Sequence, residues 1–283
     1  MTFATFAIRR FIQLIMHPEP YRVRLLRPLL KRLRALPYDV SLMFEALPRP
    51  HYGYCVYHAA RMAARLGHDR ITVIEFGVAG GNGLVVLEEH AERVGREIGI
   101  EVDVVGFDLG TGLPEPADFR DMPNVWQSGF YRMDVDRLKA RLRRAELFLG
   151  EVGAEIDRFI AEDRHPVVGA LAFDLDFYSS TLAAFRIFDL PPERILPRVF
   201  CYFDDIIHGD PIAGINRFTG QCLAIDDYNQ SHNSRKLAED RSLLVPRKYR
   251  AQWHRQIYLH HDFSHPAYTS FVGTDDDQRP LSA

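Results

Sequence analysis

The sequence predicts an α/β fold in which helices cover both faces of one seven-stranded, mostly parallel sheet. Three observations predict it: short apolar segments alternate with segments of helical periodicity, glycines cluster after the first apolar segment, and acidic residues follow the later ones. The length of 283 residues suits one such domain with an appendage. With 47% hydrophobic and 26% charged residues, the composition is typical of a globular protein.

The N-terminal region predicts a basic helical extension over residues 1–66. Residues 1–40 hold eight Arg or Lys and two acids, a net charge of +6, whereas the remainder carries −9 and the whole chain −3. Apolar residues at helical spacing cover 3–16, and further helices are expected over 21–36 and 51–66. Two roles fit the basic helices: packing on the domain or on a second subunit, or contact with an anionic membrane surface.

The body of the chain predicts a Rossmann-like, doubly wound domain over 67–273, followed by a polar tail over 274–283. Near-continuous apolar runs are typical of strands that are buried on both faces of a parallel sheet. Five such strands are expected over 71–77, 101–108, 145–150, 167–174 and 198–204. Two late strands, over 256–261 and 268–272, are expected at one sheet edge.

Composition also narrows the class of protein. A net charge near zero gives no case for nucleic-acid binding, and no apolar run approaches the roughly 18–20 residues of a membrane-spanning helix. The cysteines at 55, 201 and 222 are widely spaced and form no CxxC pair, which indicates reduced thiols. The apolar stretch after Arg9 and Arg10 is too short for an export signal. We therefore expect a cytoplasmic protein.

The first strand runs into a glycine-rich loop. Its residues are Glu75, Phe76, Gly77, Val78, Ala79, Gly80, Gly81, Asn82 and Gly83. Glycines let the backbone turn tightly and approach a ligand closely, although a plain strand–helix turn would also use them. The spacing fits neither the GxGxxG fingerprint of dinucleotide-binding proteins nor a P-loop. Asp108 ends the next strand and can accept hydrogen bonds from both hydroxyls of a ribose. Loop and Asp108 together predict a nucleoside site.

Acidic residues also follow the later strands. They are Glu151 after the third strand, Asp174 and Asp176 after the fourth, and Asp204 and Asp205 after the fifth. The carboxyl ends of parallel strands meet at one edge of a sheet, so the last four acids predict a site for Mg²⁺ or Mn²⁺. The alternative is that some of them cap helices and only one faces the site. His208, four residues beyond Asp204, is the candidate general base.

In these motifs the chain resembles class I S-adenosylmethionine-dependent methyltransferases, and among them the macrocin O-methyltransferase family. The resemblance covers residues 70–262 and rests on five motifs in order: 75–83, 104–116, 126–151, 171–181 and 202–205. The chain departs from the family in three features, which bear on the acceptor. The glycine loop lacks the usual Trp, Ile206 replaces a Tyr, and the segment 207–218 is longer.

The resemblance implies an O-methyltransferase that acts on a small-molecule or glycan acceptor, at a hydroxyl of a sugar or glycoconjugate. It implies that S-adenosylmethionine is held by Glu75, Gly77, Gly80, Gly81, Asn82, Asp108, Gly150 and Glu151. It also implies an Mg²⁺ ion on Asp174, Asp204 and Asp205, with Asp176 as an alternate or outer ligand, that lowers the pKa of the attacking hydroxyl. Asp174 and His208 are the expected catalytic residues. A non-catalytic scaffold that keeps the pocket and an NAD-dependent oxidoreductase are the alternatives.

Overall fold

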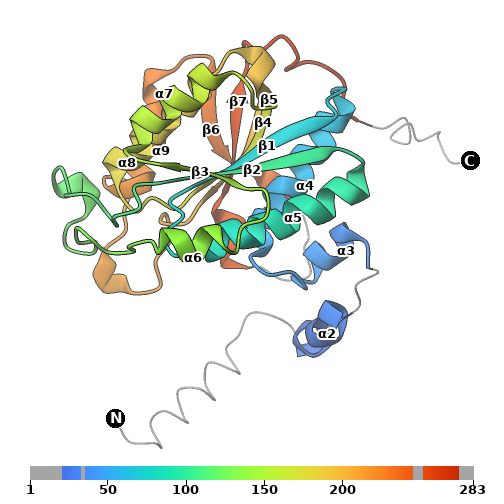
Figure 1. Ribbon diagram of the computed structural model, residues 1–283, viewed down its shortest axis with the longest axis horizontal. Helices are drawn as coiled ribbons and strands as arrows, with labels where there is room; N and C mark the ends of the chain where they lie inside the picture. The colour runs from blue at the N-terminus through green and yellow to red at the C-terminus, as the bar shows by residue number, and fades with distance from the viewer. Residues whose placement is uncertain (1–20, 33–35, 245–250, 274–283) are drawn as a thin grey trace, which may run out of the picture.

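The computed structural model describes residues 21–32, 36–244 and 251–273. The helix expected over 3–16 and the tail expected over 274–283 lie outside these ranges. Figure 1 shows a single sheet with helices packed on both of its faces, which confirms the predicted α/β architecture.

The sheet has seven strands in the order β3-β2-β1-β4-β5-β7-β6. The parallel strands are β1 (Arg70–Phe76), β2 (Glu101–Asp108), β3 (Glu146–Leu149), β4 (Val168–Phe173) and β5 (Ile195–Phe203). The strand β7 (Ile257–Asp262) runs antiparallel to both β5 and β6 (Arg235–Glu239). All five predicted parallel strands are present, and the order reverses between β1 and β4, where ligands of such sheets bind.

The edge of the sheet differs in part from the prediction. The strand expected over 256–261 is β7, but the one expected over 268–272 is wrong: these residues form turns, in which the Tyr268 N–H donates to the His265 carbonyl at 2.9 Å. The seventh strand is β6, which the sequence analysis missed. Only Leu237 of β6 is buried, so this edge strand has no run of apolar residues to reveal it.

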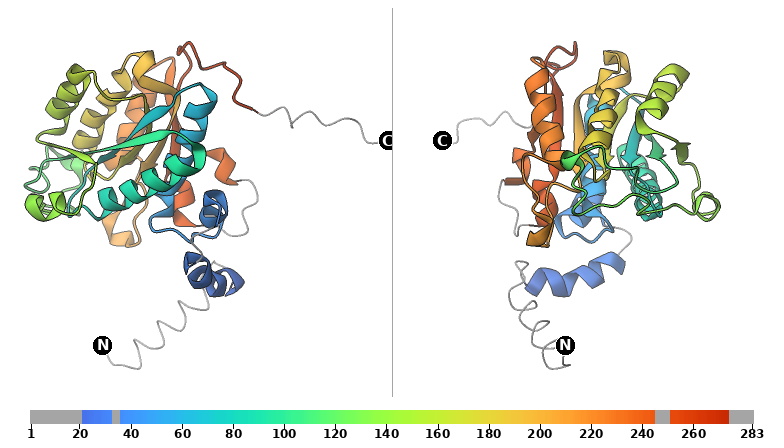
Figure 2. Two further views of the ribbon diagram at one scale, coloured as in Figure 1. Left: turned by 45° about the vertical axis from the view of Figure 1, so that its right-hand side comes forward. Right: turned by 90° about the vertical axis from the view of Figure 1, so that its left-hand side faces the viewer.

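Two helical layers enclose the sheet. Figures 1 and 2 show α4 (Pro50–Arg65), α5 (Asn82–Ile98) and α6 (Val135–Lys139) over one face, and α7 (Val152–Glu162), α8 (Tyr178–Ala184) and α9 (Gly220–Ser231) over the other. Two more helices, α2 (Tyr21–Arg32) and α3 (Tyr38–Met43), precede them. Short 3₁₀ helices lie at Phe119–Asp121, Phe185–Asp189, Pro192–Arg194, Pro211–Ala213, Arg241–Leu244 and Gln252–Arg255.

The N-terminal helices differ in how they attach to the body. The helix α4 packs on β4 and β5, and its buried face is part of the main core. In contrast, α2 lies beside the body (Figure 2), where Arg27 reaches the Phe44 carbonyl at 3.2 Å and the Glu45 carboxylate at 3.2 Å. Leu25 is 78% and Leu29 55% exposed. In the part of the chain that the structure describes, no helix is long and apolar enough to span a membrane.

A ladder of phenylalanines crosses the middle of the sheet. Phe148, Phe107, Phe76, Phe173 and Phe203 lie on five adjacent strands in register, with neighbouring ring centroids 4.9, 5.0, 5.2 and 4.7 Å apart. Each of these residues is fully buried or nearly so. Because four of them directly precede Gly77, Asp108, Asp174 and Asp204, the ladder aligns the strand ends that carry the candidate site.

Candidate functional site

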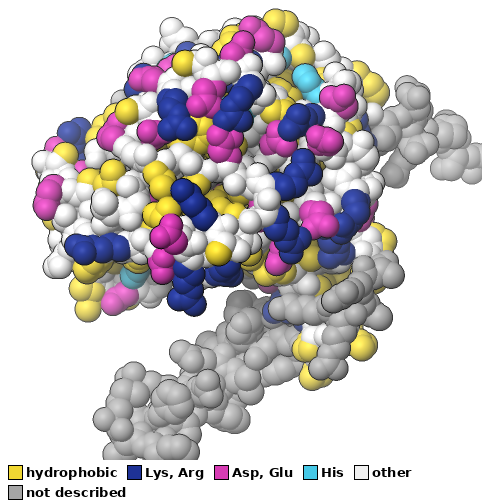
Figure 3. All heavy atoms as spheres, viewed as in Figure 1, with side chains coloured by type: hydrophobic (Ala, Val, Ile, Leu, Met, Phe, Trp, Pro, Cys, Tyr) yellow, Lys and Arg dark blue, Asp and Glu magenta, His cyan; other side chains and the backbone are white. Residues whose placement is uncertain are grey.

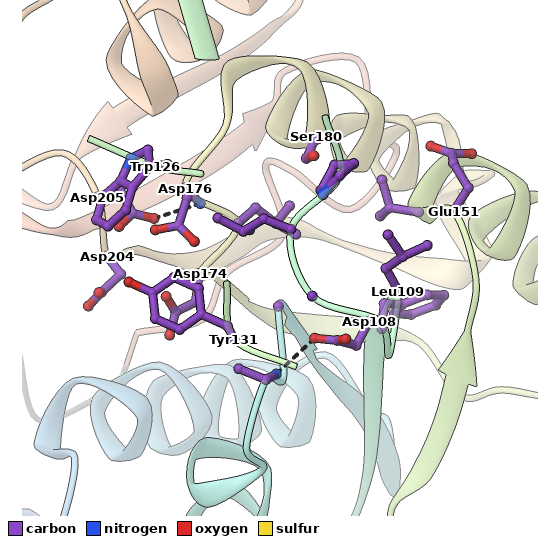
Figure 4. Close-up of a pocket in the computed structure, with 18 of the residues that line it drawn as sticks. Asp108, Leu109, Trp126, Tyr131, Glu151, Asp174, Asp176, Ser180, Asp204 and Asp205 are labelled. Carbon is purple, nitrogen blue, oxygen red and sulfur yellow. Dashed lines mark hydrogen bonds between the residues drawn. The ribbon is translucent and has the colours of Figure 1, made fainter. Parts of the chain in front are cut away.

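A cavity of about 370 Å³ opens at the carboxyl edge of the parallel strands. Figure 4 shows two groups of side chains along its walls. Asp108, Leu109 and Glu151 lie together on one side, and Asp174, Asp176, Asp204 and Asp205 lie together on the other, beside Trp126 and Tyr131. The cavity therefore spans the reversal in strand order between β1 and β4, as the sequence analysis predicted for a ligand site.

Asp108 organises the glycine loop. One of its carboxylate oxygens, Oδ2, accepts the N–H groups of Val78 at 2.9 Å and Ala79 at 2.8 Å, and Oδ1 accepts the Gly110 N–H at 2.6 Å. Since each carboxylate oxygen can accept about two hydrogen bonds, only Oδ1 keeps capacity for a ligand. The predicted bidentate grip on a ribose therefore competes with the bonds that hold the loop.

Gly77 is required by close backbone packing. Its φ is +85°, and a Cβ at this position would lie 1.7 Å from the Asp174 carbonyl oxygen. Any side chain would therefore separate the ends of β1 and β4, and with them the two halves of the cavity.

Four of the predicted cofactor residues line the cavity: Gly77, Asp108, Gly150 and Glu151. The other four do not line it: Glu75 and Gly81 are buried, whereas Gly80 and Asn82 are exposed. The Asn82 side chain accepts a hydrogen bond from Arg141 at 3.2 Å, and Gly81 packs against Leu138 so closely that a Cβ would lie 2.1 Å from it.

Glu75 is buried under the start of α5. The Tyr52 hydroxyl donates to its Oε1 at 2.6 Å, whereas Oε2 has no hydrogen-bond partner among the described residues. A Cβ on Gly83 would lie only 1.9 Å from Oε1, so α5 must begin with a glycine turn above this carboxyl group. Burial raises the pKa of Glu75 to about 8, and the Tyr52 hydrogen bond and the charge of Arg49 oppose the shift.

The carboxylates of Asp174, Asp204 and Asp205 converge. Each offers an oxygen, and these three oxygens lie within 4.8 Å of one another. Asp176 lies outside this group of three, and its backbone N–H, at a φ of +60°, donates to Asp205 Oδ2 at 3.0 Å. Three of the four predicted metal ligands are therefore brought together, and the fourth orients one of them.

Like charges dominate this cluster, and the charge of Arg49 opposes them only in part. Burial raises the pKa of Asp174 well above its usual range, and the neighbouring Asp205 and Asp204 raise it further. The pKa of Asp205 is raised in the same direction, first by burial and then by Asp176. A bound divalent cation would reverse this repulsion, and hard oxygen donors are the ligands that Mg²⁺ and Mn²⁺ prefer. The donor set therefore fits such an ion.

A second acidic group is already neutralised. Glu146, Glu162 and His165 also lie within metal-binding distance of one another. Arg164, however, pairs with both glutamates, so a positive charge occupies the position that a cation would take. The group is better explained as a surface ion-pair network.

Two buried glutamines that the sequence analysis did not identify hold the Asp204–Asp205 turn. Gln221 accepts the Asp205 N–H at 3.0 Å and donates to the Phe173 carbonyl at 3.1 Å. Gln256 donates to the Asp204 carbonyl at 2.7 Å. Both side chains are almost completely buried, but a glutamine at a helix start or before a strand gives no sign of that in the sequence.

Aromatic side chains close the cavity above the carboxylates. Trp126 and Tyr131, with ring centroids 6.4 Å apart, both line it, and Figure 4 shows Tyr131 beside Asp174. Trp126 is only 9% exposed, and its indole N–H has no hydrogen-bond partner among the described residues. Tyr131 has a φ of +62°, and burial followed by the charges of the four aspartates raises its pKa. These rings limit access to the acidic half.

His208, the predicted general base, lies outside this cavity. Its ring is exposed and meets Trp126 edge-on, with centroids 6.1 Å apart, and its Nδ1 accepts the Asp210 N–H at 3.1 Å. It is thus near the acidic half, although it does not line this cavity. Of the two predicted catalytic residues, only Asp174 lines the cavity.

The order of the sheet and the position of the cavity are those of the class I methyltransferase fold. Among solved structures, the calicheamicin methyltransferase CalS11 is similar over 88% of this chain and 95% of its own, with a TM-score of 0.50 and 18% identity. Its apo form, described as a TDP-rhamnose 3′-O-methyltransferase, is similar over 88% of this chain and 97% of its own, with a TM-score of 0.43 and 17% identity. The O-methyltransferase NovP is similar over 64% of this chain and 72% of its own, with a TM-score of 0.43 and 11% identity.

At this level of identity the similarity to CalS11 establishes the fold. No protein-family model matches the chain, and no curated protein matches it in sequence. The predicted resemblance to class I methyltransferases is therefore confirmed as a likeness of fold.

Proposed function

We propose that the protein is an S-adenosylmethionine-dependent O-methyltransferase that modifies a hydroxyl of a sugar or glycoconjugate with the help of Mg²⁺. The observation that carries the proposal is the division of one cavity into a half built on the glycine loop and a half built on converging carboxylates. A methyl donor and a hydroxyl bound to a cation need these two halves side by side.

The first half offers groups for the cofactor. Gly77 leaves the end of β1 open to the ligand, Asp108 Oδ1 can accept a ribose hydroxyl, and Glu151 lines the wall at the start of α7. The cofactor, when bound, supplies a methyl group on a sulfonium sulfur. The protein residues orient that group toward the acidic half.

The second half would hold the cation and the acceptor. Asp174, Asp204 and Asp205 are the proposed ligands, with Asp176 behind them. The Mg²⁺ ion, when bound, would lower the pKa of the attacking hydroxyl. As the new O–C bond forms and the C–S bond breaks, the hydroxyl proton must leave, and His208 or Asp174 would accept it.

We further propose that α2 attaches the protein to an anionic membrane surface. Leu25 and Leu29 lie one helical turn apart and are both exposed. The segment 21–34 holds six Arg or Lys and no acid, and each basic residue near an anionic bilayer contributes about 1 kcal/mol. Figure 3 shows acidic and basic side chains mixed over the visible face of the body, which offers no such uniform charge. Self-association through α2 is the competing outcome.

Thermal-shift titration tests the enzymatic proposal. We expect S-adenosylhomocysteine to raise the melting temperature and NAD to leave it unchanged, and Mg²⁺ to raise it further. The variant Asp204→Asn/Asp205→Asn should lose the Mg²⁺ response, whereas Glu146→Gln/Glu162→Gln, in the neutralised acidic group, should keep it. Stabilisation by NAD alone would favour an oxidoreductase, and a folded protein that ignores Mg²⁺ would refute the metal site.

A further inference from the structure

A second cavity, of about 400 Å³, adjoins the first. The two cavities share a single lining residue, Asp204. The second is lined by His51, Tyr202, Asp204, Ile207, His208, Gly209, Gln252, Trp253 and Gln256. A molecule in this cavity would therefore meet the carboxylate cluster at Asp204 without crossing the cofactor half.

The wall of the second cavity is a connected structure. His51, in the first turn of α4, stacks on Tyr202 of β5 with ring centroids 4.2 Å apart. The Tyr202 hydroxyl in turn donates to Asp204 Oδ1. Gln256 fixes the same residue through its backbone. The N-terminal region and the end of the sheet thus form one surface around Asp204.

One polar atom in this wall lacks a partner. His51 Nε2 is buried, and no described residue forms a hydrogen bond with it. Burial, and then the nearby charge of Arg49, lower the pKa of His51 to about 3, so its ring is neutral at physiological pH. Buried polar atoms are almost always satisfied by a protein group, water or a ligand. Because His51 also lines the second cavity, this atom is the candidate position for a hydrogen bond to a ligand there.

The charge around the cavity limits the kind of ligand. None of the described residues that line it is a Lys or Arg, the side chains that pair with phosphate groups. Asp204 lines the cavity directly, and Asp174 and Asp205 lie next to it. The other polar side chains that line it are uncharged groups that suit hydroxyls: the amides of Gln252 and Gln256, the imidazoles of His51 and His208, the Tyr202 hydroxyl and the Trp253 indole.

We infer that the methyl acceptor binds in this second cavity as an uncharged, hydroxyl-bearing ring compound, and that His51 Nε2 is one of its hydrogen-bonding positions. The inference rests on the proposed function and makes α4 part of the acceptor site. It also separates this chain from an enzyme that acts on a sugar nucleotide, because the described lining of the cavity offers no Lys or Arg to a diphosphate.

Saturation-transfer NMR on the full-length protein with S-adenosylhomocysteine and Mg²⁺ tests it. The neutral probes are the methyl α-glycosides of rhamnose, glucose and mannose, and the charged probe is TDP-rhamnose. We expect signal from at least one neutral glycoside, with about tenfold weaker binding in His51→Phe, which keeps the stacked ring but lacks the polar atom. His68→Phe, beyond the other end of α4, is the matched control and should bind normally.

A second variant tests the location independently of His51. A Cβ on Gly209 would meet nothing within 4 Å, so Gly209→Trp can fill the cavity without disturbing its neighbours. It should abolish glycoside binding and keep the thermal shift with S-adenosylhomocysteine. Unchanged glycoside binding in both variants would overturn the location. Binding of TDP-rhamnose alone, or of no glycoside, would overturn the ligand class. Failure of S-adenosylhomocysteine to bind would instead refute the proposed function.

Discussion

Single side chains at this site carry several tasks at once, and Asp108 is the clearest case. Two of its three hydrogen bonds to backbone N–H groups, those to Val78 and Ala79, hold the glycine loop against the end of β2, and the third holds the turn at Gly110. A ligand bound at Oδ1 would add a fourth. The residue that was expected only to bind a ribose therefore also shapes the pocket.

We predict that Asp108→Asn weakens S-adenosylhomocysteine binding by about tenfold to a hundredfold, since bonds to a charged acceptor are lost and an NH₂ group faces backbone donors. The free energy of unfolding should fall by about 1–3 kcal/mol for the same reason. Isothermal titration calorimetry and urea unfolding measure the two effects. Asp136→Asn, at an exposed position on α6, is the control. Equal affinity in both variants would contradict the role.

The raised pKa of Glu75 predicts how the stability of the protein depends on pH. Its pKa is about 8 in the folded protein against an ordinary value of 4.5, so between these pH values the folded state binds more protons than the unfolded state. Stability should therefore decrease as pH rises through this window, by up to about 1.4 kcal/mol per pH unit. Glu75→Gln imitates the neutral form and should flatten the slope of urea-unfolding free energy between pH 5 and pH 8.5, measured with EDTA present. An unchanged slope would show that Glu75 is ionised in the fold.

At the level of residues, sequence reasoning found the acids because strand ends converge in any parallel sheet. It did not find Tyr52, Gln221 or Gln256, since each is brought to the site by a contact between distant segments, and no local pattern marks a buried polar partner. Nor did it single out His51, whose unpartnered nitrogen becomes visible only once α4 is packed on β5.

Among the elements, α2 is the one whose apolar surface needs an explanation. Its predicted helix begins at Tyr21 as expected, but Leu25 and Leu29 do not pack on the body. The described helices of the body bury most of their apolar residues, so the two exposed leucines of α2 are the observation that supports the proposed membrane contact.

We predict that the protein co-sediments with phosphatidylcholine vesicles that contain phosphatidylglycerol, and less with vesicles of phosphatidylcholine alone. Leu25→Gln/Leu29→Gln should release it, because the apolar face no longer enters the interface. Leu182→Gln, at a 39% exposed leucine on α8, serves as the control. The surface would instead serve self-association if the protein did not bind vesicles, and if light scattering showed a dimer for the unaltered protein and a monomer for the double variant.

The elements themselves were largely predictable. Five buried strands and the helices between them follow from apolar runs and periodicity, and β2 has the predicted bounds. The failures lie at the sheet edge, where β6 buries only Leu237 and the 268–272 segment closes a turn through the Tyr268 hydroxyl and His261, 2.8 Å apart. Pairing at an edge depends on neighbours and not on an apolar pattern.

On the scale of the whole molecule, the phenylalanine ladder links the core to the site. Phe173 occupies its centre, between Phe76 and Phe203, and is completely buried. We predict that Phe173→Ala lowers the free energy of unfolding by about 3–5 kcal/mol. Chemical denaturation measures this, with Phe119→Ala, at a 71% exposed ring, expected to change it by less than about 0.5 kcal/mol. A small effect at Phe173 would mean that the core repacks around the gap.

The position of the ladder also predicts which parts of the molecule unfold locally and which exchange hydrogen only when the whole protein unfolds. Four of its five strands, β2, β1, β4 and β5, lie inside the sheet, so their backbone amides should exchange hydrogen with solvent only through global unfolding. The segments 109–134 and 206–219 are mostly turns and loops, so they should open locally. The acids at the ends of β4 and β5 lie between these two parts of the protein. They are attached to strands whose amides should exchange most slowly, and they lie next to segments whose amides should exchange fastest. Ligands can therefore enter and leave by rearranging surface segments while the spacing of the carboxylates stays constant.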